Sequence, residues 1–321
     1  MRIKLTGAAF LVASFAGAAT AQVTLSGNID AGIANVNDTW QVRGGGPGRN
    51  NVTFAGNEDL GGGSRAFFVL NHRFNPDDGT PSYGANNAAS QPFFRQLWVG
   101  FENKSFGDIR LGRMLVPHQQ FNGSYEPWQT YTVATMNTGG NPRNIRANDT
   151  IYYRSPSIAG ARLHLSTSDP DSQGNSLSVG KRQLGAGIRY DAGPTSFAVA
   201  WDRDAADLKT KAAYGSYDFG FAKAMFQYER IDLNKTTGFQ SKRWSVGGIV
   251  PLGVNVVKMG YKKVTDDIVG GSKVQTKYAI GIEHYLSKRT FLYSDLAKNS
   301  GDGYTNEQKK LQFDLGISHA F

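Results

Sequence analysis

The sequence predicts an all-β protein, a 16-stranded antiparallel transmembrane β-barrel with short turns at one end and long loops at the other. Three observations lead to this prediction. Polar and apolar residues alternate along the chain, turn residues divide it at regular intervals, and an export signal begins it. The 321 residues include 39 Gly, 19 Phe and 14 Tyr but no Cys, which excludes a disulfide scaffold and cysteine-based metal or redox sites.

The N-terminus has the three parts of a secretory signal. Arg2 and Lys4 precede a short apolar stretch that ends in Ala19-Thr20-Ala21, a small-residue pattern typical of a cleavage site. A first helix of the fold is the alternative, but core helices rarely combine these features. We therefore expect residues 1–21 to be a signal peptide and residues 22–321 to form one barrel domain.

Alternation with a period of two is the main signal for strands. Between residues 311 and 321, one face carries Leu, Phe, Leu, Ile, His and Phe, and the other carries Gln, Asp, Gly, Ser and Ala. Residues 23–33 show the same pattern, with Val, Leu, Gly, Ile, Ala and Ile opposite Thr, Ser, Asn, Asp and Gly. Turn signals divide the chain into sixteen such segments, with short and longer connections in alternation. The expected strands are 22–36, 50–58, 64–74, 92–101, 108–115, 149–155, 161–168, 182–191, 195–203, 209–219, 221–231, 241–250, 253–264, 274–286, 290–299 and 309–321.

Two architectures share this alternation: a water-soluble sandwich or barrel with an apolar interior, and a membrane barrel with an apolar exterior. The polar face here is rich in Gly, Ala and Ser, whereas a soluble sheet favours long charged residues. Aromatic residues such as Tyr190, Trp201 and Tyr261 fall near the ends of the apolar faces, where a membrane barrel has its interfacial girdles. The pattern favours the membrane barrel, in which sixteen strands enclose an aqueous lumen and closure satisfies every backbone group.

Residues 116–148 form the longest expected connection. Connections of this length are usually functional or disordered, and this one contains Phe121, Tyr125, Trp128, Tyr131 and Met136, a mixture unlike a disordered tract. We expect it to fold into the lumen and narrow it. The alternative is an external loop that only covers a neighbour.

Several motifs resemble the general porins of Gram-negative outer membranes, especially the neisserial and beta-proteobacterial type. They are VTLSGNIDAGI, VTFAGNEDLGGGSRAFFVL, FFRQLWVGFENKSFGDIRLGR, YYRSPSIAGARLHL, RYDAG, YGSYDFG, YLSKRT and the terminal GISHAF. The resemblance implies a homotrimer in the outer membrane whose third external loop folds inward. It also implies that the outer-membrane assembly machinery reads the terminal Phe321. Two positions depart from the family, because Ala55 and Tyr152 stand where a basic residue is usual.

A channel needs charge along its wall, because basic rings favour anions and acidic rings favour cations. Alternation directs a set of basic residues into the lumen, and the inward-folded segment adds one acid. The pore-lining and constriction candidates are Arg65, Arg73, Arg95, Arg110, Arg162 and Glu126. The same alternation directs Asp202, Glu229 and Asp314 inward. We expect the arginines near the long segment to form a basic wall across from Glu126, with a weak to moderate anion preference.

The leading function is therefore passive diffusion of small hydrophilic solutes and inorganic ions through a non-enzymatic outer-membrane channel, in contact with lipid and lipopolysaccharide. A solute-selective channel is the alternative, and an outer-membrane barrel hydrolase is a more distant one. The five histidines are scattered without metal-ligand spacing, so no cofactor or metal is expected. The basic residues alternate with apolar ones instead of forming a run, so no nucleic acid is expected.

Overall fold

The computed structural model describes residues 22–44, 50–81, 93–129, 132–138, 146–169, 181–233, 239–268 and 270–321. The expected signal peptide, residues 1–21, lies outside the described residues, as does Tyr131. No helix among the described residues is long and apolar enough to cross a bilayer.

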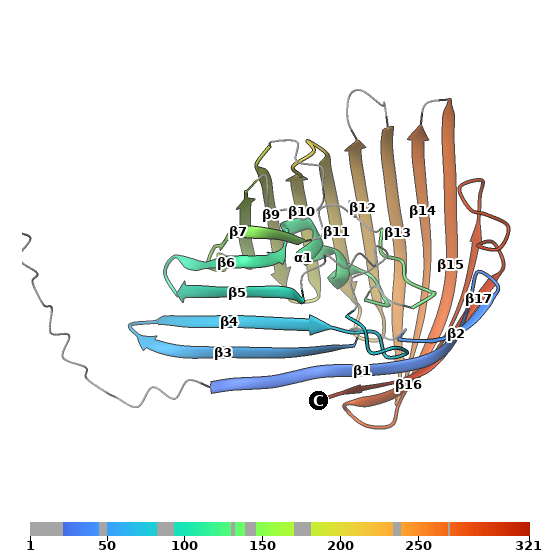
Figure 1. Cartoon of the computed structure of the whole chain (residues 1–321), viewed down its shortest axis with the longest axis horizontal. Coiled ribbons are helices and arrows are strands. Elements are labelled where there is room, and N and C mark those ends of the chain that lie inside the picture. The colour runs from blue at the N-terminus through green and yellow to red at the C-terminus, as the bar shows by residue number, and fades with distance from the viewer. Residues whose placement is uncertain are drawn as a thin grey trace, which may run out of the picture.

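The described chain is almost entirely antiparallel β-sheet (Figure 1). The strands are β1 (Gln22–Val36), β2 (Thr39–Arg43), β3 (Asn51–Gly61), β4 (Ser64–Arg73), β5 (Phe94–Asn103), β6 (Gly107–Leu115), β7 (Arg146–Arg154), β8 (Ala161–Ser168), β9 (Gln183–Ala192), β10 (Thr195–Arg203), β11 (Lys209–Asp218), β12 (Lys223–Leu233), β13 (Phe239–Leu252), β14 (Asn255–Ile268), β15 (Gly271–Tyr285), β16 (Thr290–Ser300) and β17 (Leu311–Ala320).

The sheet closes into a barrel because β1 pairs with β17, in a register that runs from Asn28 opposite Ala320 to Asn35 opposite Phe313. On its other side β1 pairs with both β3 and β2. β2 and β3 therefore act as two segments of one barrel strand, and the closed barrel has sixteen strands, as predicted.

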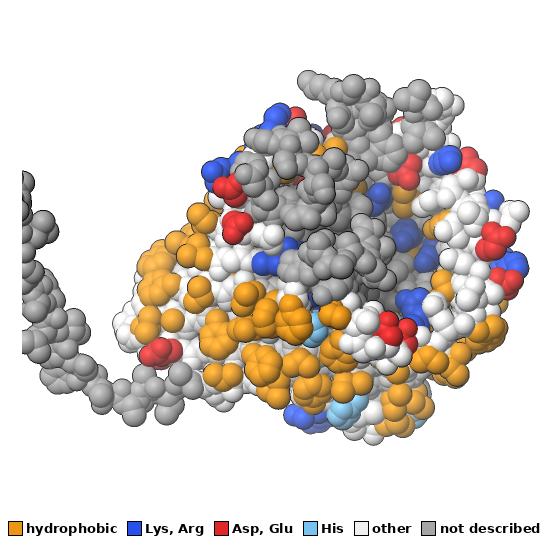
Figure 2. Space-filling model, in the orientation of Figure 1, with side chains coloured by type: hydrophobic (Ala, Val, Ile, Leu, Met, Phe, Trp, Pro, Cys, Tyr) orange, Lys and Arg blue, Asp and Glu red, His pale blue; other side chains and the backbone are white. Residues whose placement is uncertain are grey.

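Side-chain exposure identifies the outer surface. On β1, Leu25 and Ile29 are more than half exposed, whereas the adjacent Asp30 is 1% exposed. The same holds on β17, where Leu315 is exposed and Asp314 is buried. Figure 2 shows hydrophobic side chains gathered over the outer face, below a rim with charged side chains. An apolar exterior around a polar interior is the pattern of a membrane barrel, and it is the reverse of a soluble one.

Most predicted boundaries lie within a few residues of the observed ones, with two differences. The short strand β2 was not predicted; it follows a tight turn in which Asn37 and Asp38 have φ values of 52° and 65°. The predicted strands ending at 264 and beginning at 274 both run further, so β14 and β15 are joined by a tight connection instead of a longer loop.

The long segment after β6 folds into the barrel, as predicted. It begins with helix α1 (Pro117–Asn122) and a 3-10 turn, Gly123–Tyr125. Figure 1 shows α1 inside the ring of strands. Of the aromatic residues expected to narrow the lumen, Phe121, Tyr125 and Trp128 are each 1% exposed. We call residues 116–138, where described, the inner loop.

Candidate functional site

The first half of the inner loop packs on β8 to β11. Phe121 and Tyr125 form a buried cluster with Tyr214 and with small alanines on β10 and β11. The Tyr125 and Tyr214 rings stack with centroids 5.5 Å apart, and Phe121 meets His164 of β8 edge to face at 4.9 Å. Aromatic pairs of this kind add to the burial energy, so this half of the loop is fixed to the wall.

Glycines on the inner face of the wall make room for the large side chains of the loop. A Cβ built on any of four of them would lie 2.6 Å from a loop atom, closer than real contacts allow. These pairs are Gly185 with Pro117, Gly187 with Phe121, Gly247 with Pro127, and Gly260 with Met136. The glycine-rich polar face seen in the sequence is therefore the seat of the inner loop.

Buried acids on the wall accept hydrogen bonds from the loop. Asp202 of β10 accepts from His118 Nδ1 at 2.8 Å, and Glu229 of β12 accepts from Asn122 Nδ2 at 2.5 Å. Two more carboxylates lie opposite each other in the register of β16 and β17, Asp295 and Asp314. Their loop donors are Trp128 Nε1, at 2.7 Å from Asp295 Oδ1, and the Val133 N–H, at 2.8 Å from Asp314 Oδ2.

Three cations from adjacent strands bind carbonyl oxygens at the end of the loop. Arg243 Nη1 donates to Thr138 O at 2.9 Å, Lys262 Nζ to Asn137 O at 3.0 Å, and Lys277 Nζ to Val133 O at 2.8 Å. Together with the acids, these contacts hold the loop against β8 to β17. None of these contacts involves β3 to β6.

Comparison with known proteins identifies the family. The model of the Gram-negative porin family matches residues 7–304. The chain belongs to the Gram-negative porin family. It is 30% identical to "Outer membrane porin protein 32" of Delftia acidovorans over the whole of both chains.

Solved structures agree on the fold. The "Anion-selective porin from Comamonas acidovorans" superposes with a TM-score of 0.80 at 27% identity, covering 94% of this porin and all of that chain. The in-vitro folded OmpT of Vibrio cholerae in its trimer form gives 0.73 at 13% identity, with 94% and 99% coverage. The resemblance seen in the sequence motifs is thus confirmed, and this porin is a channel protein of the outer membrane.

Glu126 lies on the inner loop of the porin, but its carboxylate is turned into the loop. It is 1% exposed and accepts hydrogen bonds from the Trp128 and Met136 N–H groups at 3.1 Å and from Thr135 Oγ1 at 3.0 Å. Burial raises the pKa of Glu126 above its ordinary value, and these hydrogen bonds together with attraction by Lys262 offset part of the rise. In this arrangement its oxygens hold the loop together and do not face the open lumen.

Arg65 and Arg110 both have acidic partners. Arg65 forms an ion pair with Glu102 and keeps a side-chain exposure of 48%, near the tight turn that joins β3 to β4. Arg110 Nε donates to Asp108 Oδ1 at 2.7 Å. Its guanidinium also lies over the Trp98 ring, 4.9 Å from the centroid. The positive charge of Arg110 therefore interacts with both a carboxylate and an aromatic ring.

Of the other three basic candidates, two lie near each other on β4 and β5 and one lies apart on β8. Arg73 is the last residue of β4, opposite Asn51. Arg95 is buried at the start of β5, where the register passes from Asn71–Gln96 to His72–Phe94 and leaves Arg95 as the extra residue of a bulge. Arg162 is the second residue of β8 and lies opposite Arg189. The structure therefore does not gather the six candidates into one cluster.

Tyr152, one of the two departures from the family pattern, has a structural role. It faces inward, is 1% exposed, and its hydroxyl lies 2.7 Å from His164 Nδ1. His164 in turn contacts Phe121 of the inner loop. Where the family usually has a pore cation, this porin has a tyrosine that supports the seat of the loop.

Sequence reasoning missed Arg154 and Asp108. Arg154 Nε donates to Asp108 Oδ2 at 2.7 Å, so Asp108 binds two arginines, of which the other is Arg110. Alternation could have revealed Arg154, because it lies on the same inward face of β7 as Tyr152. Sequence reasoning also missed Asp295, whereas alternation directed Asp202, Glu229 and Asp314 inward. The loop partners of these acids are 84 to 181 residues away, and no local pattern reveals them.

Phe321 closes the barrel seam. Its N–H and C=O both bond with the backbone of Gly27 at 3.1 Å, and its ring lies where a Gly27 side chain would be. Its role as an assembly signal stays a prediction.

Proposed function

We propose that this porin is a passive channel for small hydrophilic solutes and ions, with a weak to moderate preference for anions. One observation carries the proposal, namely the unequal placement of charge in the lumen. Asp202, Glu229, Asp295 and Asp314 are at most 3% exposed, and each is bound to the inner loop. By contrast, the arginine is the more exposed partner in the ion pairs Arg65–Glu102 and Arg154–Asp108, with side-chain exposures of 48% against 28% and 25% against 2%.

The unequal exposure favours anions because a permeating ion meets the charges that line the water-filled path. The acids behind the loop are buried and bound to its donors, whereas Arg65 and Arg154 are more exposed than the carboxylates that pair with them. The anion selectivity given in the name of the Comamonas acidovorans porin is in keeping with this proposal.

Planar-bilayer recordings of the purified mature protein test the proposal. A general channel predicts conductance that rises linearly with salt and no saturation by added sugars or small organic anions. A current that one solute class blocks in a saturable way would favour the alternative, a solute-selective channel.

We infer a non-enzymatic role. A barrel hydrolase needs a histidine that can exchange protons with a bound substrate. His118 is the one described histidine with an acid partner, and it is fully buried against Asp202. His164 is bound to Tyr152, and His284 and His319 lie beside Asn255 and Thr290.

The family resemblance also supports a homotrimer that is inserted by the outer-membrane assembly machinery after removal of residues 1–21. Cross-linking of the protein in native membranes tests the oligomer. N-terminal sequencing of the membrane form tests the cleavage site. A largest crosslinked species of any mass other than three copies contradicts the trimer.

A further inference from the structure

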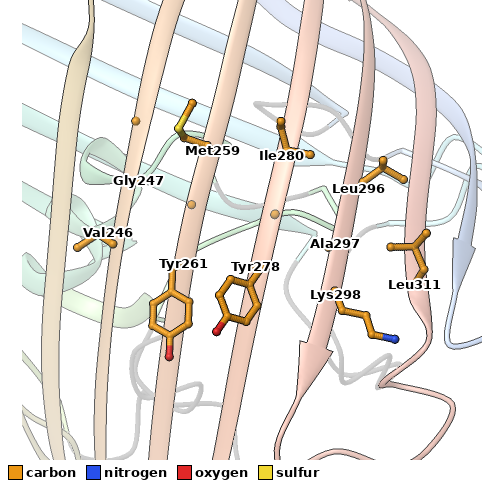
Figure 3. Close-up of a pocket in the computed structure, with 13 residues that line it drawn as sticks. Val246, Gly247, Met259, Tyr261, Tyr278, Ile280, Leu296, Ala297, Lys298 and Leu311 are labelled. Carbon is orange, nitrogen blue, oxygen red and sulfur yellow. The ribbon is translucent and has the colours of Figure 1, made fainter.

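A groove runs along the outer face of the barrel over β13 to β17. It has a volume of about 810 Å³, and Figure 3 shows its labelled lining residues. At one end of the groove, Gly248 occupies an outward position opposite Met259. A Cβ there would meet its nearest neighbours at 3.6 and 4.0 Å, so this position has room for a larger side chain.

Strand register arranges the lining residues in rows. One row is apolar and consists of Gly248, Met259, Ile280 and Leu296. The other row consists of Val246, Tyr261, Tyr278, Lys298 and Leu311. The Tyr261 and Tyr278 rings touch, with centroids 4.8 Å apart. In Figure 3 both hydroxyls and the Lys298 amine lie at the same end of the groove.

This polar end lies toward the long loops. Lys298 is two residues from the end of β16, before the connection that leads to β17. The opposite end of β16 follows the tight turn after Tyr285. Since long loops of such barrels are external and both termini lie on the other side, Lys298 lies at the level of the outer leaflet.

The charge on this face is of one sign. The next row toward the long loops holds Trp244, Lys263, Thr276 and Ser300, so the three rows contain two lysines and no acid. Two acids lie beyond these rows, and each already has a partner: Asp267 is within 4.0 Å of Lys242, and Asp302 accepts the Val274 N–H. A lysine amine beside an apolar, lipid-facing groove is favourable only when its charge reaches water or an anion at the interface.

We propose that this groove binds the phosphorylated glycolipid of the outer leaflet, with an acyl chain along the apolar row and a phosphate on Lys298. The proposal rests on the positive charge of Lys298 and on its position at the level of the outer leaflet. A basic side chain at headgroup depth is the usual way a membrane protein binds an anionic headgroup, and the tyrosine hydroxyls supply neutral donors beside it.

The test uses the purified mature porin in detergent, with native mass spectrometry to count bound lipid. The probes are diphosphorylated lipid A and phosphatidylcholine. Lys298→Gln removes the charge, and Gly248→Leu fills the groove. Lys211→Gln is the matched control, because Lys211 is an exposed lysine on β11, opposite Trp201, outside the groove.

We expect the wild type to retain lipid A in preference to phosphatidylcholine. Lys298→Gln should bind lipid A about tenfold more weakly, in line with the loss of a hydrogen bond to a charged group. Gly248→Leu should also bind lipid A more weakly, and Lys211→Gln should bind it as tightly as the wild type. Single-channel conductance should be unchanged in all three variants, so this test is independent of the proposed channel function.

Three results would overturn the proposal. Lys298→Gln could bind lipid A as tightly as the wild type, or Lys211→Gln could weaken binding equally. Gly248→Leu could instead change the mass of the oligomer while lipid A stays bound, which would mean that a second copy of the chain covers the groove.

Discussion

Trp128 Nε1 donates a hydrogen bond of 2.7 Å to Asp295 Oδ1, joining the inner loop to β16 across 167 residues of sequence. Asp295 faces Asp314 in the strand register, and Asp314 accepts the Val133 N–H. Two adjacent carboxylates thus hold two points of the loop. A buried acid that loses its donor costs more than the bond alone contributes, so these contacts determine where the loop lies.

Trp128→Phe keeps an aromatic ring but removes the donor to Asp295. We expect a loss of about 1–3 kcal/mol in the free energy of unfolding and a channel with more frequent conductance fluctuations. Thermal unfolding in detergent and single-channel recording measure the two effects. Trp244→Phe on the outer face is the matched control. An equal loss in that variant would contradict the role given to the hydrogen bond between Trp128 and Asp295.

Gly260→Val should displace the inner loop, because a Cβ at Gly260 would lie 2.6 Å from Met136 Cγ and 3.0 Å from the Trp128 ring. The expected result is an altered single-channel conductance with the barrel still folded. Gly248→Val is the control, since it adds the same side chain to the outer face of the adjacent strand without a close contact. Equal conductance in both variants would mean that the glycine is not part of the seat.

The His118–Asp202 pair should make the loop sensitive to pH. Burial opposes a charge on His118, but attraction by Asp202, the hydrogen bond to Asp202 and attraction by Glu229 outweigh it, so the pKa of His118 is raised above 6.5. A raised folded-state pKa contributes stability that is fully present below pH 6.5 and is lost as pH rises through the folded value.

The unfolding temperature of the wild type, relative to His118→Gln, should therefore be highest at acidic pH and fall as the pH rises above 6.5. The same series recorded for His284→Gln, whose ring lies beside Asn255, provides the control. A difference between wild type and His118→Gln that grows with pH would contradict the pairing.

Arg95→Ala should widen the pore and move its selectivity toward neutrality, because it removes both volume and positive charge from the wall. Conductance and reversal potential measure the two changes. Lys211→Ala, on the outer face, should leave both at their wild-type values. An Arg95→Ala channel with unchanged selectivity would remove Arg95 from the set that determines anion preference.

The barrel could be predicted from the sequence because alternation is a local property. Each strand shows it without reference to its neighbours, and even the closing strand ending at Phe321 could be located. The ends of β14 and β15 were less clear, because residues such as Asp266 and Asp267 extend past the membrane, where the outward face need not be apolar. β2 was not predicted because it is only five residues long, too short to show a clear alternation, and because it follows the turn at Asn37 and Asp38 directly.

The inner loop illustrates the limit of local patterns. Its length and aromatic content predicted that it folds inward. The direction of Glu126 could not be predicted, because its partners Trp128, Thr135 and Met136 surround it only once the loop is folded. Likewise, no local signal marks Gly187 or Gly260 as contacts of the loop, since each meets a residue far away in the sequence.

The proposed anion preference requires net positive potential along the water-filled path between the inner loop and the wall. The reversal potential of the wild-type protein in a planar bilayer, under a gradient of potassium chloride, measures this property. We expect a potential whose sign is set by chloride and whose size falls as total salt rises. A potential set by potassium, or a bilayer that carries no current after the protein inserts, would contradict it.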